Sequence, residues 1–291
     1  MTVMMRAPFS AWLFCMAFLS CLPVAQAQLI LPGAVQAPAK GAKPQIIGRD
    51  GQPVKRAKPA AVKVPGEEAI TGQDMALNGS RGRIVFARNA DSLNITSLTL
   101  DGAQISHPDD TCRVDVVSGA PLIAKPLGRP TGALRFGVEL EACPFSFDVL
   151  EGAILVGPVP AICQFPAADC KVDPAGLWGP RASALTGERI KQVERSRVQL
   201  ENTMRENFRD LLSRTHGKAA IKAVASEQAG FTSARAQVCR DYVREDVHGF
   251  CSLRLTEARA MALRVMVGQV SQDDNEKKSE SRRKRRGAVP L

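Results

Sequence analysis

Two stretches near the C-terminus decide the fold of that part of the chain: QAGFTSARAQVC (residues 228–239) and CSLRLTEARAMAL (residues 251–263). Side chains that recur every three or four residues lie on one face of a helix. In the first stretch these are Gln228, Phe231, Arg235 and Cys239. In the second they are Cys251, Leu255, Thr256, Arg259 and Leu263. We therefore predict two helices joined by a short turn.

The two cysteines of these stretches lie where the predicted helices meet. Cys239 stands near the end of the first helix and Cys251 at the start of the next. Cysteines placed in this way can meet across a turn, within the short Cα–Cα distance that a disulfide needs. We predict a Cys239–Cys251 disulfide that staples the two helices where they would otherwise fray.

The spacing Q-x2-[aromatic]-x3-R-x3-C, followed by C-x3-L-T-x2-R-x3-L, resembles the LprI-type lysozyme-inhibitor domain family over about residues 186–266. The resemblance implies a small, secreted helical module of the bacterial envelope, in a family whose members mostly have no assigned activity. It also implies lysozyme, another peptidoglycan hydrolase or another envelope protein as partner. Phe231 and Ala236 stand where the family usually has Trp and Asp. Since binding depends on sites and not on folds, inhibition does not transfer with the fold.

The N-terminus has the features of an export signal. One positive charge in residues 1–6 precedes an apolar run over residues 11–24, and Ala25-Gln26-Ala27 supplies the small residues of a cleavage site. We predict that residues 1–27 are removed and that the mature protein is periplasmic or secreted. The alternative, a lipid-modified Cys21, lacks a good lipobox. No later stretch reaches the ~20 apolar residues of a membrane span, so we expect no transmembrane segment in the mature chain.

Signal removal leaves six cysteines, at positions 112, 143, 163, 170, 239 and 251. An even number in an exported chain indicates three disulfides, and six cysteines allow fifteen pairings. The sequence favours the sequential pairing Cys112–Cys143, Cys163–Cys170 and Cys239–Cys251. The zinc alternative lacks tight C-x2-C pairs with a nearby His, so we expect no metal site.

The mature chain divides into five segments by composition and period. Residues 28–79 are rich in Pro, Ala and Lys and predict a disordered linker. Residues 80–165 switch to a period of two, which predicts a small antiparallel β-sandwich or barrel. Its expected strands are residues 83–86, 93–100, 113–117, 134–140, 145–150 and 154–156. The fold class is therefore α+β, with the β domain followed by a disulfide-stapled three-helix bundle.

The C-terminal half begins with a connector, residues 166–182, which contains Trp178. We expect Trp178 to plug the junction between the two modules; the alternative is a platform for a sugar ring. The LprI-like helical domain covers residues 183–270. Its three helices are expected at about 186–216, 218–243 and 250–270, and the second turns Ile221, Val224, Phe231, Val238 and Tyr242 inward.

A basic tail closes the chain over residues 271–291, where Arg282–Arg286 form an unbroken run of positive charge. We expect this tail to be disordered and to contact anionic lipid or another anionic envelope polymer. In a cytosolic protein such a run would suggest nucleic acid. The export signal argues against that partner.

The sequence offers little catalytic chemistry. No H-E-x2-H or H-x3-H spacing, G-x-S-x-G elbow or phosphate-binding glycine motif occurs. We therefore expect no enzyme and no cofactor. Arg235 and Arg259 are the charged residues of most interest. Packing of their stems, with their heads paired to acidic residues such as Glu227 or Asp241, is the first interpretation, and direct ligand contact is the alternative.

Three classes of function remain. The chain is expected to be a non-enzymatic binding or structural protein of the envelope; the alternatives are a genuine inhibitor of lysozyme or another peptidoglycan hydrolase, and an undetected enzyme. Residues 183–268 carry fifteen Lys and Arg against ten Asp and Glu. Because many lysozymes are basic, this charge opposes their approach.

Overall fold

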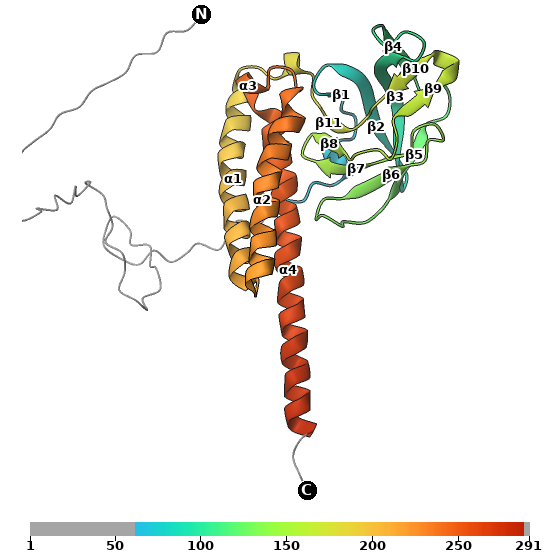
Figure 1. Cartoon of the computed structure of the whole chain (residues 1–291). Helices are drawn as coiled ribbons and strands as arrows, with labels where there is room; N and C mark the ends of the chain where they lie inside the picture. Colours follow the sequence, from blue (N-terminus) through green and yellow to red (C-terminus); the bar gives the residue numbers. More distant parts are fainter. Residues whose placement is uncertain (1–61, 288–291) are drawn as a thin grey trace, which may run out of the picture. The chain divides into compact units, whose positions relative to one another are not determined.

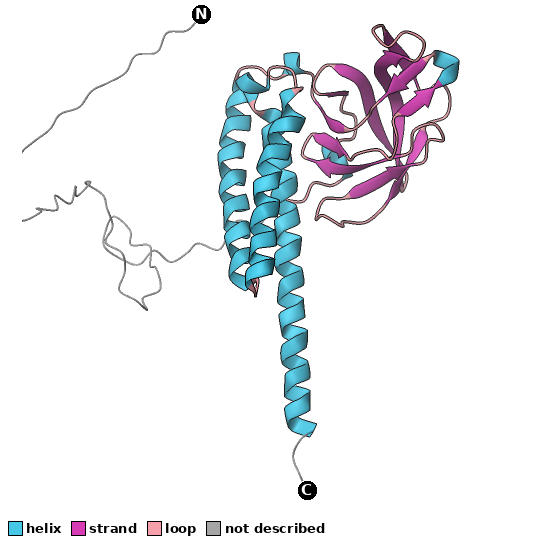
Figure 2. Ribbon diagram, in the orientation of Figure 1, coloured by secondary structure: helices cyan, strands magenta, loops and turns pink. Residues whose placement is uncertain are grey.

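A computed structural model of the chain describes residues 62–287, with side chains described through residue 272. The predicted signal peptide, the linker up to residue 61 and the last four residues lie outside this range. Within it, strands and helices form separate layers (Figures 1 and 2). No helix in the described range has a stretch long and apolar enough to cross a membrane.

Eleven strands form one antiparallel sheet that closes on itself. The ring of neighbours runs β3-β2-β1-β11-β8-β7-β6-β5 and returns to β3, which makes an eight-stranded barrel. Strands β4, β10 and β9 extend it from the far end of β3. The strands are β1 Met75–Leu77, β2 Arg81–Asn89, β3 Ser92–Gln104, β4 Thr111–Asp115, β5 Leu122–Pro126, β6 Arg135–Val138, β7 Phe145–Leu150, β8 Ala153–Val156, β9 Cys163–Phe165, β10 Cys170–Val172 and β11 Gly176–Gly179.

The alternating pattern of the strands fills the barrel. Phe86, Phe136 and Phe147 point inward from three strands, and the rings of Phe86 and Phe136 lie 5.2 and 5.6 Å from that of Phe147. Aromatic pairs at these distances add to the stabilisation from burial alone. All six predicted strands are observed, and the barrel is the one of the two predicted β architectures that the chain adopts.

Four helices follow the barrel, where the sequence predicted three: α1 Glu188–Arg214, α2 Lys218–Arg240, α3 Glu245–His248 and α4 Phe250–Gly287. The one-turn α3 lies in the predicted turn between the second and third helices. Helices α1, α2 and α4 run alongside one another (Figure 1). Ile221 was expected to face inward, but its side chain is exposed.

The turn around α3 is built from polar side chains that satisfy backbone groups. The Glu245 carboxylate accepts the amides of Cys251 and Ser252 at 2.9 and 2.8 Å, and so caps the start of α4. The buried His248 accepts the Phe250 amide at Nδ1, so its Nε2–H donates to a backbone carbonyl 2.9 Å away. The turn is therefore held by its own side chains as well as by the disulfide.

The barrel and the helices share a tight junction. The buried Tyr242 hydroxyl donates to the Pro180 carbonyl at 2.7 Å. Gly179 makes room for that ring, because a β-carbon there would lie 3.0 Å from the hydroxyl. Gly132 has φ +87°, and its β-carbon would lie 2.9 Å from the Met261 carbonyl oxygen. Only glycine combines this backbone conformation with such a close approach.

One member of a buried ion pair on α4 forms a hydrogen bond with the barrel. Glu257 and Arg254, one turn apart on α4, are both buried and paired. Burial raises the pKa of Glu257, and the neighbouring Arg254 opposes that effect. A Glu257 oxygen also accepts the backbone amide of Glu151 at the β7–β8 turn, 3.3 Å away.

Three disulfides are present between residues 62 and 287, and two of them differ from the predicted sequential pairing. Cys112 is joined to Cys170 and Cys143 to Cys163, with Cα–Cα distances of 5.6 and 4.9 Å. The first links β4 to β10, which flank β3 from opposite sides. Sequence order cannot anticipate this arrangement, because it arises from the sheet topology. The predicted Cys239–Cys251 disulfide is confirmed, with a Cα–Cα distance of 5.5 Å.

Three predicted boundaries are also corrected. The linker does not reach residue 79, because Ile70 and Met75 are buried in the barrel core. The connector is not separate from the β domain, since it contains β10 and β11. The tail predicted from Ser271 continues α4 as far as Gly287. In this segment acidic residues precede basic residues by four positions, at 273/277, 274/278 and 280/284, a spacing that supports a helix.

Candidate binding site

A cleft of about 1290 Å³ lies where the barrel meets helices α2 and α4. Leu155, Val156 and Pro158 line it from the barrel side. Phe231, Val238 and Leu255 line it from the helices. We call this space the cleft. Its two walls come from distant parts of the sequence, so no single segment reveals it.

The helical wall contains four of the residues that carry the LprI-like pattern: Phe231, Arg235, Leu255 and Arg259. Phe231 is half-buried, with the Arg235 and Arg259 guanidinium carbons 5.6 and 5.7 Å from its ring centre. Cations at this distance from an aromatic ring are attracted to its face. Leu255 lines the cleft, whereas Leu263 is buried among the helices. The pattern thus describes one connected cluster.

Hydrogen bonds fix both arginines of this cluster. Arg259 donates to Gln228 at 3.0 Å and to Glu227 at 2.6 Å. Arg235 donates to Thr256 at 2.7 Å and lies 3.8 Å from a Glu201 oxygen. The predicted pairing of Arg259 with Glu227 is observed. The arginines therefore hold α2 and α4 together and so fix the shape of the helical wall of the cleft.

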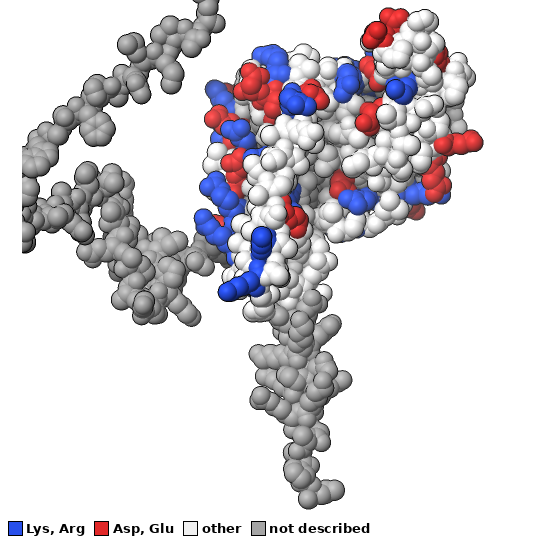
Figure 3. All heavy atoms as spheres, viewed as in Figure 1, with Lys and Arg blue, Asp and Glu red and all other residues white. Residues whose placement is uncertain are grey.

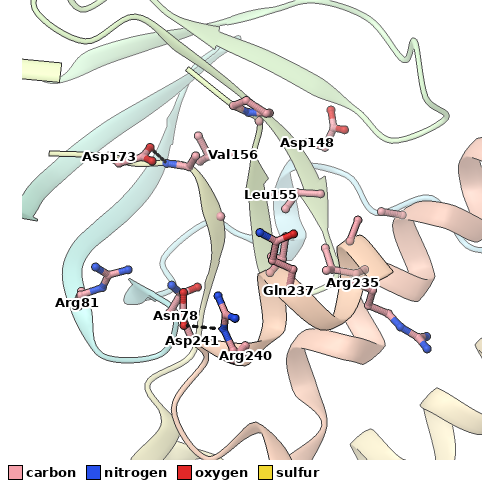
Figure 4. Close-up of a pocket in the computed structure, with 18 of the residues that line it drawn as sticks. Asn78, Arg81, Asp148, Leu155, Val156, Asp173, Arg235, Gln237, Arg240 and Asp241 are labelled. Carbon is pink, nitrogen blue, oxygen red and sulfur yellow. Dashed lines mark hydrogen bonds and ion pairs between the residues drawn. The ribbon is translucent and has the colours of Figure 1, made fainter. Parts of the chain in front are cut away.

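Asp241, the other acidic partner considered for these arginines, lies elsewhere. It forms a 3.7 Å ion pair with its neighbour Arg240. Figure 4 shows Asn78, Arg81, Arg240 and Asp241 close together at one end of the cleft. The Arg81 side chain is exposed and forms no hydrogen bond or ion pair with the side chains described over residues 62–272. Its charge helps to lower the pKa of Asp101, after the larger effect of Arg113. This end carries two guanidinium groups against one carboxylate.

Three further carboxylates line the cleft, and two of them are neutralised within the barrel. The third, Asp173, is exposed and accepts the Ala175 amide at 2.9 Å. Asp101 accepts two hydrogen bonds from Arg113, at 2.7 and 3.2 Å, and one from the Gly82 amide. The Arg113 guanidinium lowers the pKa of Asp101 below its ordinary value. Asp148 is held in the same way by Arg135, at 2.6 and 2.8 Å. Neither Asp101 nor Asp148 is available to a ligand.

Two buried polar atoms in the walls of the cleft lack partners among the described residues. They are Oδ1 of Asn78 and Nη2 of Arg259, and these residues are only 6% and 9% exposed. The first is an acceptor and the second a donor. A buried group without a hydrogen bond costs about 1–3 kcal/mol, so both positions favour a ligand or water that completes them.

Trp178 does not serve as a platform for a ligand. It is 1% exposed in the barrel core, and its Nε1–H donates to the Pro174 carbonyl at 2.9 Å. Trp178 therefore lies inside the barrel, and the prediction that it plugs the junction between the two modules is wrong. The sugar-stacking alternative is excluded for the same reason, since no ring face is open.

A second cluster of polar side chains lies on the surface of the barrel. Ser106 lies between His107, 3.0 Å from its Oγ, and Asp169, to which the hydroxyl donates. A nucleophilic serine needs a base that takes its proton, with the acid behind the base. Here the carboxylate receives the hydrogen bond directly, and the same contact lowers its pKa. No group of three or more metal-binding side chains occurs among the described residues.

With this geometry in view, the chain was compared with known proteins. No family model, curated protein or solved structure matches it. The resemblance to the LprI-type family therefore remains a proposal.

Asn78, Arg81 and Arg240, at the charged end of the cleft, were not predicted from the sequence as site residues. Asn78-Gly79 was assigned to the linker, yet it forms the tight turn between β1 and β2, with φ +51° and +75°. An Asn-Gly pair is the strongest local signal for such a hairpin turn. That signal could have placed Asn78 and Arg81 on the barrel. Nothing local could have brought them to Arg240.

Proposed function

We propose that this chain is an exported bacterial envelope protein with a non-enzymatic role, which binds a partner in the cleft. The observation that carries the proposal is the position of the LprI-like residues. Gln228, Phe231, Arg235 and Arg259 are gathered behind one wall of a cleft large enough for a ligand. The signal-like N-terminus and three disulfides support an oxidising compartment outside the cytoplasm.

The walls of the cleft are well suited to binding because they are held before a partner arrives. The barrel wall belongs to a closed sheet, which has no freedom to open along an edge. The helical wall is fixed by the Cys239–Cys251 disulfide and by the Arg259–Gln228 hydrogen bond. A preformed site loses less conformational entropy on binding, which favours affinity.

A second candidate function is inhibition of lysozyme or another peptidoglycan hydrolase. It is favoured by the same cluster, since the residues of the LprI-like pattern lie together at one site. In this reading helices α1, α2 and α4 form the LprI-type three-helix module. The net positive charge of residues 183–268 argues against a basic lysozyme as the target.

The proposal is tested by filling the cleft. Ala234 lines the cleft on α2, whereas Ala225 is exposed on the same helix and does not. We expect Ala234→Trp to abolish retention of the mature protein on isolated envelope proteins and polymers. Ala225→Trp adds the same side chain outside the cleft and should leave retention unchanged. Circular dichroism shows whether both variants fold. Equal retention of wild type and folded Ala234→Trp contradicts the proposal.

A further inference from the structure

We infer that the occupant of the cleft is an extended segment of another protein that carries apolar and acidic side chains. This inference rests on the proposed function and adds the chemical class of the ligand. It is drawn from four properties of the cleft: its size, its lining, its unpartnered polar atoms and its charge.

The size and lining of the cleft favour a polypeptide. Its volume of about 1290 Å³ exceeds the roughly 300–1,000 Å³ of small-molecule pockets. Both walls supply aliphatic side chains, and the helical wall also has alanines at positions 234, 258 and 262. Small residues leave room for the side chains of a ligand. A groove of this kind suits a chain that places successive apolar side chains against both walls.

The unpartnered atoms call for a ligand that both donates and accepts hydrogen bonds. Asn78 offers a buried acceptor, and Arg259 a buried donor, on opposite walls. Each peptide unit carries one N–H donor and one C=O acceptor. An acyl chain has neither, so the hydrophobic part of a lipid would leave both atoms unsatisfied. A polypeptide is favoured over a lipid on this ground.

The aromatic content of the cleft argues against a polysaccharide. Phe231 is the aromatic side chain among the described lining residues, and two guanidinium groups already lie over its ring. Trp178 is enclosed in the barrel core. No open ring is left for the flat face of a sugar.

The charge at the Asn78 end of the cleft determines the sign of the charge that the ligand carries there. Asp101 and Asp148 are neutralised by Arg113 and Arg135. The charged groups of the cleft that remain open are Arg81, Arg240 and Asp241 at the Asn78 end, and Asp173 elsewhere on the barrel wall (Figure 4). Guanidinium groups form strong, paired hydrogen bonds with carboxylates. An Asp or Glu side chain, or a C-terminal carboxylate, fits between them.

The experiment uses a phage-displayed library of random twelve-residue peptides, panned on the folded mature protein. Enriched peptides are then synthesised with a fluorescent label and titrated by anisotropy. We expect them to combine apolar residues with Asp or Glu, and to lose binding to Ala234→Trp. We expect Arg81→Glu to weaken the binding of these peptides by at least about tenfold. The loss of affinity should be larger at low salt than at high salt. Arg195→Glu, the same change on the exposed surface of α1, should have no effect.

The outcomes separate this inference from the proposed function. No enrichment, or enriched peptides that are basic or that still bind Ala234→Trp, overturns the inference. If the same protein binds peptidoglycan fragments or anionic liposomes and Ala234→Trp abolishes that binding, the cleft is a binding site for another class of ligand and only the inference fails. If Ala234→Trp changes no interaction, both fail.

Discussion

At the scale of single residues, the interior of this protein depends on polar atoms that find partners in a different element. The indole of Trp178 donates to Pro174, and the hydroxyl of Tyr242 donates to Pro180. Both side chains therefore bury large rings without leaving a polar atom unpaired. Five buried side-chain atoms depart from this rule among the described residues, and two of them, in Asn78 and Arg259, belong to residues that line the cleft.

A prediction at this scale concerns Asp101 and the effect of pH. Its pKa is lowered in the folded protein, chiefly by Arg113, so the ionised form stabilises the fold above the ordinary value of 3.8. We expect Asp101→Asn to lower the free energy of unfolding by about 1 kcal/mol at neutral pH, given the partial exposure of the pair. The difference from wild type should shrink as the pH falls below 3.8, and disappear below the lowered pKa that Asp101 has in the folded protein.

Urea unfolding at pH 7 and pH 3 measures this difference. Asp109→Asn is the matched control, because it removes the same charge from an exposed turn. A loss of stability in Asp101→Asn that is as large at pH 3 as at pH 7 would show that the carboxylate charge is not the cause.

Some site residues could be predicted from the sequence and others could not. Phe231 and Arg235 share one helix face, and Leu255 and Arg259 share another, so their spacing predicted each of these pairs. Arg81 and Arg240 come from a barrel turn and a helix end, which only the tertiary fold places side by side. Trp178 was misplaced for a related reason. Pro and Gly around it indicate a break in helix, but they do not distinguish a loop from a short strand.

At the scale of elements, α2 is the most weakly held helix. Cys239 is its one fully buried residue among those described, and much of its surface consists of Ala, Gly, Ser and Thr. Figure 3 shows few charged atoms over the middle of this helix. In contrast, α1 and α4 contribute most of the buried apolar side chains of the helical core. The position of α2 therefore depends strongly on its disulfide.

The three disulfides give a prediction at this scale. Removing Cys239–Cys251, which closes 12 residues, should cost about 3 kcal/mol, and removing Cys112–Cys170, which closes 58, about 4 kcal/mol. Urea unfolding of the paired Cys→Ala variants checks this order. Hydrogen exchange should show that the first variant loses protection mainly in α2, and the second in β4 and β10. Equal loss of protection across the whole molecule would contradict the local role assigned to each bond.

The strands were easier to predict than their connections. A period of two identified six strands, but β1, β5, β9, β10 and β11 were missed. Four of the five have only three or four residues, or lie beside Pro and Gly, so they show too few alternations to be seen. Closure of the barrel depends on three of these, β1, β5 and β11. For this reason the sequence did not distinguish a β-sandwich from a β-barrel.

At the scale of the whole molecule, charge decides between the two proposed partners. The chain has a formal net charge of +10, and residues 282–286 add a basic run near its C-terminus. We expect the mature protein to inhibit a basic lysozyme weakly or not at all. We expect it to bind anionic liposomes or peptidoglycan through contacts that weaken as salt rises, because screening shortens to about 8 Å at physiological ionic strength.

Two titrations check this, one against a basic lysozyme and one against the anionic surface at low and high salt. A variant in which the five basic residues 282–286 are replaced by Gln separates the tail from the cleft. Stoichiometric inhibition of lysozyme, with no binding that depends on salt, would show that the family resemblance predicts the partner better than the charge does.

The closed ring of strands also sets the order in which this chain can fold as it is made. β1 lies between β2 and β11, and the last of these ends at Gly179, about one hundred residues downstream. At roughly 5–20 residues per second, synthesis of that stretch takes roughly 5–20 s. During this interval Ile70, Met75 and Leu77 have no complete core to enter. β1 is therefore the barrel strand that is synthesised longest before one of its neighbours, β11. The nascent chain is most prone to aggregation until β11 has been made.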